Sequence, residues 1–522
     1  MKKITSALVS VHDKTGIVEL CSFLSKRGVK ITATSGTAKA LEKKGVKAID
    51  VSRLTGFPEM LDGRIKTLHP LIFAPIMADR GKNEHLEALM QINAEPIDLV
   101  VVNVPAPVET RQTDEARTEE AIGIINVGGI ALIRAAASNH ADTCVVVSPA
   151  QYTEIMEEMK KRDGRLSPET RFRLALKAFE FTTSYDMEIH DFLSRRVHRD
   201  KRFPATLFMK HEKAEDLRYG ENPHQKAAFF RLPRYAGVSM GSLRQLNGQA
   251  LSYNNVMDIS TALEIVLEFD RTAAVVVKQG TPVGVAVDKE PAKAYRRARD
   301  VDPQSAVGGV VAINGSVDKK AAAEMTGTFI EAVIATRFTE GALQEFASSK
   351  RAAHTRIIEM PVKRWSKPGG GLDVRSVPGG LLVQERDELL LPRGGHLKVM
   401  TKRKPTRKQL TDMIIAWKVC KYVRSNAIVL ARDAQTIGTG AGQMSRMDSM
   451  RLALEKAGNR CLGSVMASDA FIPFRDVIDE AARHGIAAII QPGGSPRDDE
   501  LVAAADEHNI SMATTGMRHF KR

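Results

Sequence analysis

The sequence SALVSVHDKTGIVELCSFLSKRGVKITATSGTAKALEKKGVKAIDV, residues 6–51, alternates short apolar runs with amphipathic stretches. The apolar runs are rich in β-branched residues and indicate strands, whereas the stretches between them place apolar residues at helical spacing. Strands and helices that alternate in this way predict an α/β fold with a parallel sheet covered by helices. The predicted strands are Ser6–Val11, Val29–Thr34 and Val46–Val51, and the predicted helices are Lys14–Arg27 and Thr37–Lys44.

Two further buried strands are predicted at Ile97–Val102 and Thr143–Val147. Ligands of such sheets bind beyond the carboxyl ends of the strands, where loops lead into helices. The loop Thr34–Thr37 combines small hydroxyl side chains with a glycine at the start of a helix, which suits a phosphate group. Ordinary N-capping by Thr34 or Ser35 explains the same residues, so both interpretations stay open.

The predicted secondary structure of the rest of the chain changes at two points. A helical extension begins at about residue 150, with one strongly periodic run at Pro168–Ser184. From Leu217 onward, glycine-rich loops separate short strands, and the polar segment Ser348–Arg375 is expected to link two halves of this region. The predicted domains are therefore residues 1–198 and 199–522. The strands expected in the second domain are Ala273–Lys278, Gly309–Ile313, Ala427–Ala431 and Ala487–Gln491.

Composition indicates a soluble globular protein, since 43% of the 522 residues are hydrophobic and 26% are charged. No run of about 18 apolar residues is present, so we expect no membrane span. The four cysteines lie far apart and form no CxxC pair. Free thiols in a reducing cytoplasm are therefore expected, rather than a disulfide framework or a zinc site, and no metal is predicted.

The formal net charge of +14 permits two interpretations, a nucleic-acid surface or pockets for small anions. The basic residues are scattered through the chain apart from short clusters at Arg195–Arg202 and Lys398–Lys408. Aromatic residues make up only 5%, which leaves few stacking platforms for single strands. Small anions are the favoured partners, and no nucleic-acid partner is expected.

Six segments carry a resemblance to a known family. They are Gly56–Met60 (GFPEM), Gly63–Pro70 (GRIKTLHP), Leu217–Gln225 (LRYGENPHQ), Gly440–Arg446 (GAGQMSR), Ser468–Asp476 (SDAFIPFRD) and Gln491–Ser495 (QPGGS) followed by Arg497–Asp499. In this order they resemble the bifunctional AICAR transformylase/IMP cyclohydrolase family of purine biosynthesis. The resemblance runs from about residue 5 to the C-terminal Met517–Phe520.

The resemblance implies an architecture and a setting. It implies an N-terminal methylglyoxal-synthase-like parallel-sheet domain for cyclisation, and a C-terminal pair of cytidine-deaminase-like α/β subdomains for formyl transfer. It further implies a cytoplasmic homodimer whose transformylase sites lie across the subunit interface, with an AICAR-like nucleotide and 10-formyltetrahydrofolate as substrates. The subdomains of the family lack the zinc of the deaminases, which agrees with the missing CxxC pair.

Formyl transfer to a weakly nucleophilic aromatic amine requires a base for the amine proton and a positive group for the oxyanion. The family resemblance places a Lys-His pair for this purpose after a buried strand. Here the strand ends in Lys278, and Gln279 occupies the histidine position. A glutamine side chain forms hydrogen bonds but accepts no proton near neutral pH. His224 is a candidate helper, and its alternative role is structural.

The substrate-binding positions implied by the resemblance match the family pattern more closely than the catalytic positions do. Arg218, Arg446 and Arg518 suit the recognition of phosphate and carboxamide groups, because a guanidinium offers forked donors. An ordinary ion pair is the alternative role of any one of these arginines. By resemblance, the residues that bind AICAR or folate are Arg218, Tyr219, Gly308, Glu331, Asn426, Arg446, Phe471, Asp476, Ser495 and Arg518.

The cyclohydrolase positions depart further from the family. Pro105 stands where the resemblance implies a tyrosine, Asn126 where it implies an aspartate, and Ser138 where it implies a lysine. Ring closure requires a proton shuttle, so these replacements predict a loss of cyclisation. Lys66 is the catalytic residue that remains. Nucleotide binding is expected to persist through Ser10, Lys14, Thr34, Gly36, Thr37, Arg64, Lys66, Thr67 and Asn103.

Three functions follow from this pattern. The first is an enzyme of the family that acts mainly as a formyltransferase, with cyclisation impaired or lost. The second is a redirected enzyme that acts on an AICAR-like substrate. The third is a non-catalytic paralogue that binds a purine nucleotide or folate.

Overall fold

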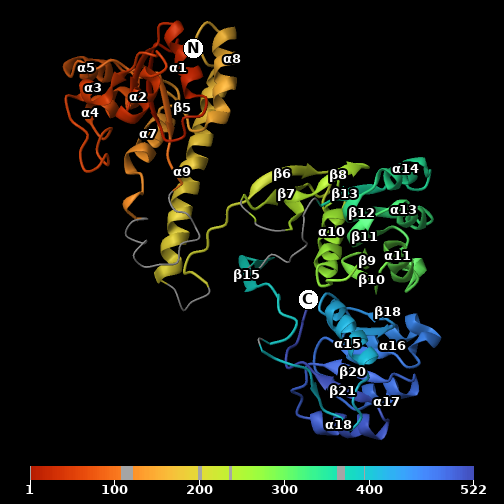
Figure 1. Ribbon diagram of the computed structural model, residues 1–522. Helices are drawn as coiled ribbons and strands as arrows, with labels where there is room; N and C mark the ends of the chain where they lie inside the picture. Colours follow the sequence, from red (N-terminus) through yellow and green to blue (C-terminus); the bar gives the residue numbers. More distant parts are fainter. Residues whose placement is uncertain are drawn as a thin grey trace. The chain divides into compact units, whose positions relative to one another are not determined.

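The computed structural model describes residues 2–106, 122–197, 203–233, 235, 238–360, 371–392 and 394–522. The chain divides into two compact units, Met1–Lys210 and His211–Arg522, which Figure 1 colours from red to yellow and from yellow-green to blue. The domain boundary predicted from the sequence, between residues 198 and 199, lies outside the described residues.

The N-terminal unit is built on a five-stranded parallel sheet with the strand order β3-β2-β1-β4-β5. Its inner strands are buried because their side chains alternate between two apolar cores: Ala7 and Val9 face one core, and Leu8 faces the other. The strands are β1 (Ser6–Val11), β2 (Lys30–Ala33), β3 (Ile49–Asp50), β4 (Leu99–Asn103) and β5 (Cys144–Val146).

Helices cover both faces of this sheet. Helices α1 and α8 contribute to the core that contains Val9, and α4 and α7 contribute to the core that contains Leu8. The described helices are α1 (Ile17–Lys26), α2 (Ser35–Glu42), α3 (Val51–Thr55), α4 (Pro70–Met77), α5 (Asn83–Gln91), α7 (Val127–Ser138), α8 (Tyr152–Lys161) and α9 (Pro168–Val197). The predicted parallel α/β fold is thus confirmed. The helix predicted over Pro168–Ser184 continues to Val197, because the buried side chains of Tyr185 and Phe192 extend its packed face.

The C-terminal unit contains a sheet of twelve strands in the order β16-β21-β20-β19-β17-β18-β10-β9-β11-β12-β13-β8. Two separate ribbons, β6 (Glu212–Leu217) with β7 (Ala227–Arg231) and β14 (Leu372–Val377) with β15 (Gly380–Glu385), accompany it. The strands of the large sheet are β8 (Arg244–Asn247), β9 (Ala273–Lys278), β10 (Thr281–Val287), β11 (Gly309–Val317), β12 (Ile330–Phe338), β13 (Arg356–Glu359), β16 (Lys398–Val399), β17 (Ile428–Arg432), β18 (Gln435–Gly440), β19 (Val465–Ser468), β20 (Ala488–Gln491) and β21 (Ser511–Thr514).

The large sheet is a duplication. Strands β9 to β13 have the spatial order β10-β9-β11-β12-β13, and β17 to β21 have the matching order β18-β17-β19-β20-β21. In each half the first strand pairs antiparallel with its two neighbours, and the last three strands are parallel. The halves join where β10 and β18 pair at Ala286 and Gln435. This topology agrees with two subdomains of one kind, as the resemblance implies.

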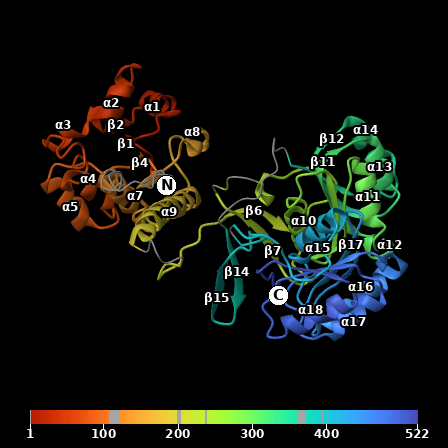
Figure 2. The same ribbon diagram turned by 60° about the horizontal axis from the view of Figure 1, so that its bottom comes forward.

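Each half carries one helix on one face of the sheet and several on the other. Helices α10 and α15 share the core on the first face, and the remaining helices form a separate core in each half. Figure 2 shows the first half in green and the second in blue. The helices are α10 (Tyr253–Val266), α11 (Pro291–Arg299), α12 (Pro303–Ala306), α13 (Lys319–Thr326) and α14 (Glu340–Ser348), then α15 (Arg407–Cys420), α16 (Arg446–Ala457), α17 (Asp476–Arg483) and α18 (Asp498–Glu507).

The segment between the halves is more ordered than the sequence predicts. Strand β13 lies inside the polar stretch Ser348–Arg375 that was expected to be a link, because Ile357 and Ile358 are buried against the first half. The glycine-rich part of that stretch, residues 361–370, lies outside the described residues. The outermost strands of the sheet, β8 and β16, are short and pair antiparallel with β13 and β21.

Candidate functional site

The first group of predicted residues lies at the carboxyl ends of β1, β2 and β4. Asn103 ends β4, and its Oδ1 accepts hydrogen bonds from the backbone N–H groups of His12 (2.7 Å) and Asp13 (2.8 Å). Its Nδ2 donates to the carbonyl of Asp13 (3.0 Å). Asn103 therefore fixes the loop that leaves β1, and the Nζ of Lys14 in the same loop donates to the carbonyl of Val11 (3.1 Å).

The start of α2 lies beside this loop. Thr34 is the N-cap residue, but its side chain forms no capping hydrogen bond among the described residues. Instead its Oγ1 lies 3.3 Å from the Oγ of Ser10 and 3.4 Å from the Oγ1 of Thr37. A Cβ atom added to Gly36 would meet open space. The arrangement is suited to an anion, because the helix N-terminus is not occupied by its own cap side chain.

The segment 63–70 reaches the same end of the sheet. The Nζ of Lys66 lies 3.4 Å from Oε1 of Glu59. Thr67 is buried, and a Cβ atom added to Gly128 at the start of α7 would lie 3.1 Å from its Oγ1. Arg64 is exposed on the same segment. Lys66, Thr67 and the start of α7 are thereby brought into one region.

Two of the three replaced residues belong to this region. Asn126 is the N-cap of α7: its Oδ1 accepts from the N–H of Gly129 (2.7 Å), and its own N–H donates to the Tyr185 hydroxyl (2.8 Å). Pro105 follows Asn103 by two residues. Ser138 is elsewhere, because it is the last residue of α7 and donates to the Ala135 carbonyl (2.8 Å). Along a helix of twelve residues the ends stand roughly 16 Å apart, so the structure does not bring Ser138 together with Asn126.

The second group of predicted residues lies on the first half of the large sheet. Lys278 ends β9, and its Nζ donates to the carbonyl of Val307 (2.7 Å). Gln279 is exposed and has a positive φ of 51° in the turn to β10. The carboxylate of Asp258, on α10, accepts from the N–H groups of Gln279 (3.2 Å) and Gly280 (2.6 Å). Burial raises the pKa of Asp258; the two N–H groups oppose the rise, and the Glu331 carboxylate adds to it.

A polar network continues from this turn along the starts of the neighbouring strands. Glu331 accepts from Nη1 of the buried Arg356 (2.7 Å), whose Nε donates to the Gln249 carbonyl (3.1 Å). The side chain of Gln249 in turn accepts from Nη1 of Arg218 (3.0 Å), whose guanidinium lies 5.7 Å from the Tyr219 ring centre. The network thus joins the predicted residues Arg218 and Glu331.

Gly308 lies next to the carbonyl that Lys278 binds. It has a φ of 72°, and its N–H donates to the carbonyl of Phe329 (2.8 Å). A Cβ atom at Gly308 would lie 3.6 Å from the Phe329 ring, which is 42% exposed. Phe329 therefore supplies an aromatic wall beside Gly308. His224 is exposed.

The third group of predicted residues lies on the second half of the sheet. The Nδ2 of Asn426 donates to the carbonyls of Gln443 and Met444, each at 3.0 Å. Arg446 is buried, with Nη2 donating to Oδ1 of the fully buried Asp469 (2.8 Å) and Nη1 to the Phe471 carbonyl (3.2 Å). Its Nε has no partner among the described residues. Arg446 is therefore directed into the protein, where its guanidinium forms an ion pair with Asp469.

The other residues of the third group lie on loops at the same edge. The Oγ of Ser495 accepts from the N–H of Arg497 (3.2 Å), in a loop where Gly493 and Gly494 have positive φ. Asp476 begins α17, and Phe471 is 39% exposed. The guanidinium of Arg518 lies 4.7 Å from the centre of the Phe520 ring.

The second and third groups share one edge of the sheet. Strand β9 is antiparallel to β10, β10 to β18 and β18 to β17, so the end of β9 and the start of β17 point to the same side. The starts of β11 and β12 and the ends of β19 and β20 lie on that side as well. Three strand intervals separate β9 from β17, which places Lys278 and Asn426 roughly 14 Å apart.

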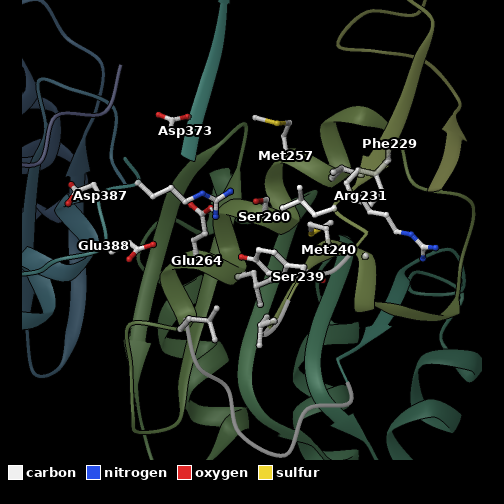
Figure 3. A pocket seen from close by; sticks show the side chains of 18 of the residues that line it. Phe229, Arg231, Ser239, Met240, Met257, Ser260, Glu264, Asp373, Asp387 and Glu388 are labelled. Carbon is white, nitrogen blue, oxygen red and sulfur yellow. Dashed lines mark ion pairs between the residues drawn. The ribbon is translucent and has the colours of Figure 1, made fainter. Parts of the chain in front are cut away.

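A cavity of about 780 Å³ lies on a different face of α10. Figure 3 shows Met257, Ser260 and Glu264 of this helix directed into it, opposite Asp373, Asp387 and Glu388. The buried Lys421 and the partly buried Lys521 also line the cavity, and burial lowers the pKa of Lys521. None of the residues predicted from the sequence lines this cavity, so it is separate from the sheet edge.

Some residues of these sites carry little sequence signal. Asp258 stands between the apolar residues Met257 and Ile259 of α10, and Arg356 precedes two buried isoleucines in a strand. Both patterns deviate from the expected side-chain type, which is the one signal that could have identified them. Asp469 lies within the segment SDAFIPFRD, but nothing in the sequence indicates its ion pair with Arg446.

No group of three or more His, Cys, Asp or Glu side chains suited to a metal ion is found over the described ranges. The four cysteines are unpaired and buried, and burial raises the pKa of Cys21 and of Cys144 to about 12. Among the helices that the structure describes, none is long and apolar enough to cross a membrane.

Comparison with known proteins gives consistent matches. The family model of the AICARFT/IMPCHase bienzyme matches residues 136–456, and the MGS-like domain model matches residues 16–131. The bifunctional purine biosynthesis protein PurH of Persephonella marina is 45% identical over 519 residues, covering 99% of both chains. PurH of Acetivibrio thermocellus is 45% identical over 521 residues, covering 99% of this chain and 100% of that protein. Among solved structures, the crystal structure of ForH matches 36% of this chain and 99% of its own, with 28% identity and a TM-score of 0.34.

Proposed function

Because the chain belongs to the family of AICARFT/IMPCHase bienzymes, the PurH proteins, we propose that it transfers the formyl group of 10-formyltetrahydrofolate to AICAR, and that its cyclisation of the product to IMP is impaired or lost. The observation that supports formyl transfer most directly is the sheet edge at Lys278. There a lysine, a glycine with an adjacent aromatic ring, and a polar network from Arg218 to Glu331 come together.

Lys278 is the proposed catalytic cation. In the transfer, the AICAR amine attacks the formyl carbon, a carbon–nitrogen bond forms, and negative charge develops on the formyl oxygen. A lysine ammonium near that oxygen stabilises the charge. The hydrogen bond from Nζ to the Val307 carbonyl sets the direction of the Lys278 side chain toward Gly308. The tetrahedral intermediate then collapses: the bond between the formyl carbon and N10 of the folate breaks, N10 takes up a proton equivalent to the one the amine loses, and tetrahydrofolate leaves.

Gln279 leaves the proposed site without a base at the position where the family resemblance implies a histidine. The amine must lose a proton as the new bond forms, and a glutamine side chain cannot accept it near neutral pH. We therefore expect a transfer rate below that of an enzyme with a histidine at this position, by a factor on the order of 10²–10⁴ where no other group replaces the base.

The binding of AICAR and folate is assigned to the remaining predicted residues on the two halves of the sheet. Gly308 and Glu331 on the first half, at the starts of β11 and β12, stand four and five strand intervals from Asn426 on the second half, which is roughly 19 Å and 24 Å. We propose a homodimer in which a second copy of the chain brings a first half and a second half together. A cytoplasmic location accords with a purine biosynthetic role and with four buried free thiols.

The N-terminal unit is proposed to bind a nucleotide without closing its ring efficiently. The loop fixed by Asn103 and the uncapped start of α2 suit a phosphate, while Lys66 and Thr67 lie near the start of α7. Proline at 105 and asparagine at 126 offer no group that exchanges a proton near neutral pH.

A decisive experiment incubates the purified protein with AICAR and 10-formyltetrahydrofolate, and follows tetrahydrofolate release and IMP absorbance separately. The expected result is tetrahydrofolate release with accumulation of the formylated nucleotide and little IMP. Release no faster than in a sample without protein would refute the transferase, and efficient IMP formation would refute the loss of cyclisation.

A second candidate is a non-catalytic paralogue that binds nucleotide or folate, and the replacements at Gln279, Pro105 and Asn126 favour it. Calorimetry with AICAR on the same sample separates the two functions: binding without tetrahydrofolate release identifies the binding protein. Release with an AICAR analogue but not with AICAR itself identifies a redirected enzyme.

A further inference from the structure

The two halves of the large sheet contain the same strained turn. The β9–β10 hairpin turns through Gln279 and Gly280, with φ of 51° and 69°. The β17–β18 hairpin turns through Asp433 and Ala434, with φ of 55° and 58°. Two-residue hairpins in which both central residues have positive φ match the twist of the flanking strands. Three of these four residues are not glycine, so each turn needs outside support.

An aspartate on the preceding helix supplies this support in both halves. Asp258 accepts from the N–H groups of Gln279 (3.2 Å) and Gly280 (2.6 Å), and Asp412 accepts from those of Asp433 (3.0 Å) and Ala434 (2.7 Å). The bonds span 21 and 22 residues in each half.

The supporting helices match as well. Each aspartate is the sixth residue of a helix of 14 residues, α10 or α15. Each helix begins with a capping box, formed by Ser252 with Asn255 in α10 and by Thr406 with Gln409 in α15. The fold therefore contains one supporting device in two copies.

The residues around the two turns differ. In the first half, the turn follows Lys278, whose Nζ is bound to the Val307 carbonyl beside Gly308. In the second half, the matching position is Arg432, which pairs with Asp433 and donates to the Leu462 carbonyl (2.7 Å). The second turn points to the opposite edge of the sheet, since β17 runs opposite to β9. Only the first copy bears residues of the proposed transfer site.

We propose that Asp258 is a positioning residue of the transfer site: its carboxylate fixes the turn that directs Lys278 and Gln279, whereas Asp412 supports an equivalent turn that takes no part in the reaction. This inference rests on the proposed formyl transfer. Without the carboxylate, two N–H groups of the turn lose their acceptor and Gln279 loses support for its positive φ. Displacement of a catalytic group by about 1 Å lowers a rate by up to about 10²-fold.

The test compares Asp258→Asn with Asp412→Asn. Asparagine keeps the shape of the side chain, but only its oxygen accepts hydrogen bonds, so each variant loses one of two matched bonds. The measurements are kcat for tetrahydrofolate release, the Kd for AICAR by calorimetry, and the thermal midpoint. We expect D258N to lower kcat by about 10- to 100-fold with little change in Kd. D412N is expected to keep the wild-type kcat. The thermal midpoint is expected to fall by a similar amount in D258N and D412N.

The outcomes distinguish this inference from the proposed function. Equal losses of kcat in D258N and D412N, or full activity in D258N, would overturn the positioning role alone. A wild-type protein that releases no tetrahydrofolate would overturn the proposed function, and this inference with it. Where D258N does not fold, Asp258→Glu keeps the charge and moves the acceptor by one methylene. D258E is then expected to lower kcat with Kd retained, and wild-type kcat in it overturns the inference.

Discussion

The proposed nucleotide site of the N-terminal unit and the proposed transfer site of the C-terminal unit both carry Asn or Gln where the family resemblance implies a group that exchanges protons, but the two sites differ. At the N-terminal site, the side chain of Asn126 caps α7 by accepting from the N–H of Gly129. At the transfer site, Gln279 has a positive φ in a turn whose N–H groups donate to Asp258. In both places the side chain that exchanges no proton lies in a well-defined backbone setting. The difference lies in the lysine of each site: Lys278 is directed toward Gly308 by its hydrogen bond to the Val307 carbonyl, whereas Lys66 pairs with Glu59.

Replacing the retained cation tests this difference most strongly. Lys278→Ala is expected to lower the rate of tetrahydrofolate release by about 10²–10³-fold, since it removes the group proposed to stabilise the oxyanion. The matched control is Arg432→Ala, at the equivalent position of the duplicated turn, which should leave the rate unchanged. Wild-type rates in Lys278→Ala would show that the two sites do not differ in the way proposed.

Restoring the missing base should sharpen the comparison. Gln279→His is expected to raise formyl transfer by at least about tenfold, because imidazole accepts the amine proton near neutral pH. The pH profile of the variant should gain an acid limb near the ordinary histidine pKa of about 6.5. Asp433→His, in the second turn, is the control and should change neither quantity. An unchanged rate in Gln279→His would mean that the whole site is reshaped.

The stability of the N-terminal unit should depend on the carboxylate of Asp98, which lies at the amino ends of β1 and β4. Burial of Asp98 opposes ionisation, but hydrogen bonds from Arg80 and Thr5 outweigh it and hold the pKa of Asp98 below its ordinary value. The stabilisation is therefore present above the unfolded pKa of about 3.9 and is lost as pH falls through the lower folded pKa. Asp98→Asn should cost about 1–3 kcal/mol at pH 7 and flatten this acid dependence in denaturant titrations. Equal acid sensitivity in both proteins would contradict the assignment.

The smallest effect is expected at Ser138. Ser138→Lys restores the residue type implied by the family, yet it lies at the far end of α7 from Asn126. Because Ser138 and Asn126 of one chain lie far apart, Ser138→Lys should not increase IMP formation from the formylated nucleotide. The double variant Pro105→Tyr with Asn126→Asp, at the carboxyl edge of the sheet, is the one expected to increase it. The reverse result would place the cyclisation site at the other end of the helix.

Much of the fold could be predicted because it depends on local patterns. The strands Ser6–Val11 and Ala273–Lys278 have the predicted bounds, since apolar β-branched runs between turn residues mark buried strands. The hydrogen-bond partners of Asp258, Arg356 and Arg446 could not be predicted, because each partner is distant in sequence. The separation of Ser138 from Asn126 required the actual length of α7. Strand β13 was missed because four residues in a polar segment give too short a pattern.

The outermost strands of the large sheet bear on how the protein behaves at high concentration. An open sheet presents unpaired N–H and C=O groups at its two rims, where strands of other molecules could add and start a fibril. Here β8 is four residues long and contains Arg244, and β16 is two residues long and begins at Lys398. Short, charged rims of this kind offer few contacts for strand addition. A twelve-stranded sheet is thereby protected against growing into an aggregate at either end.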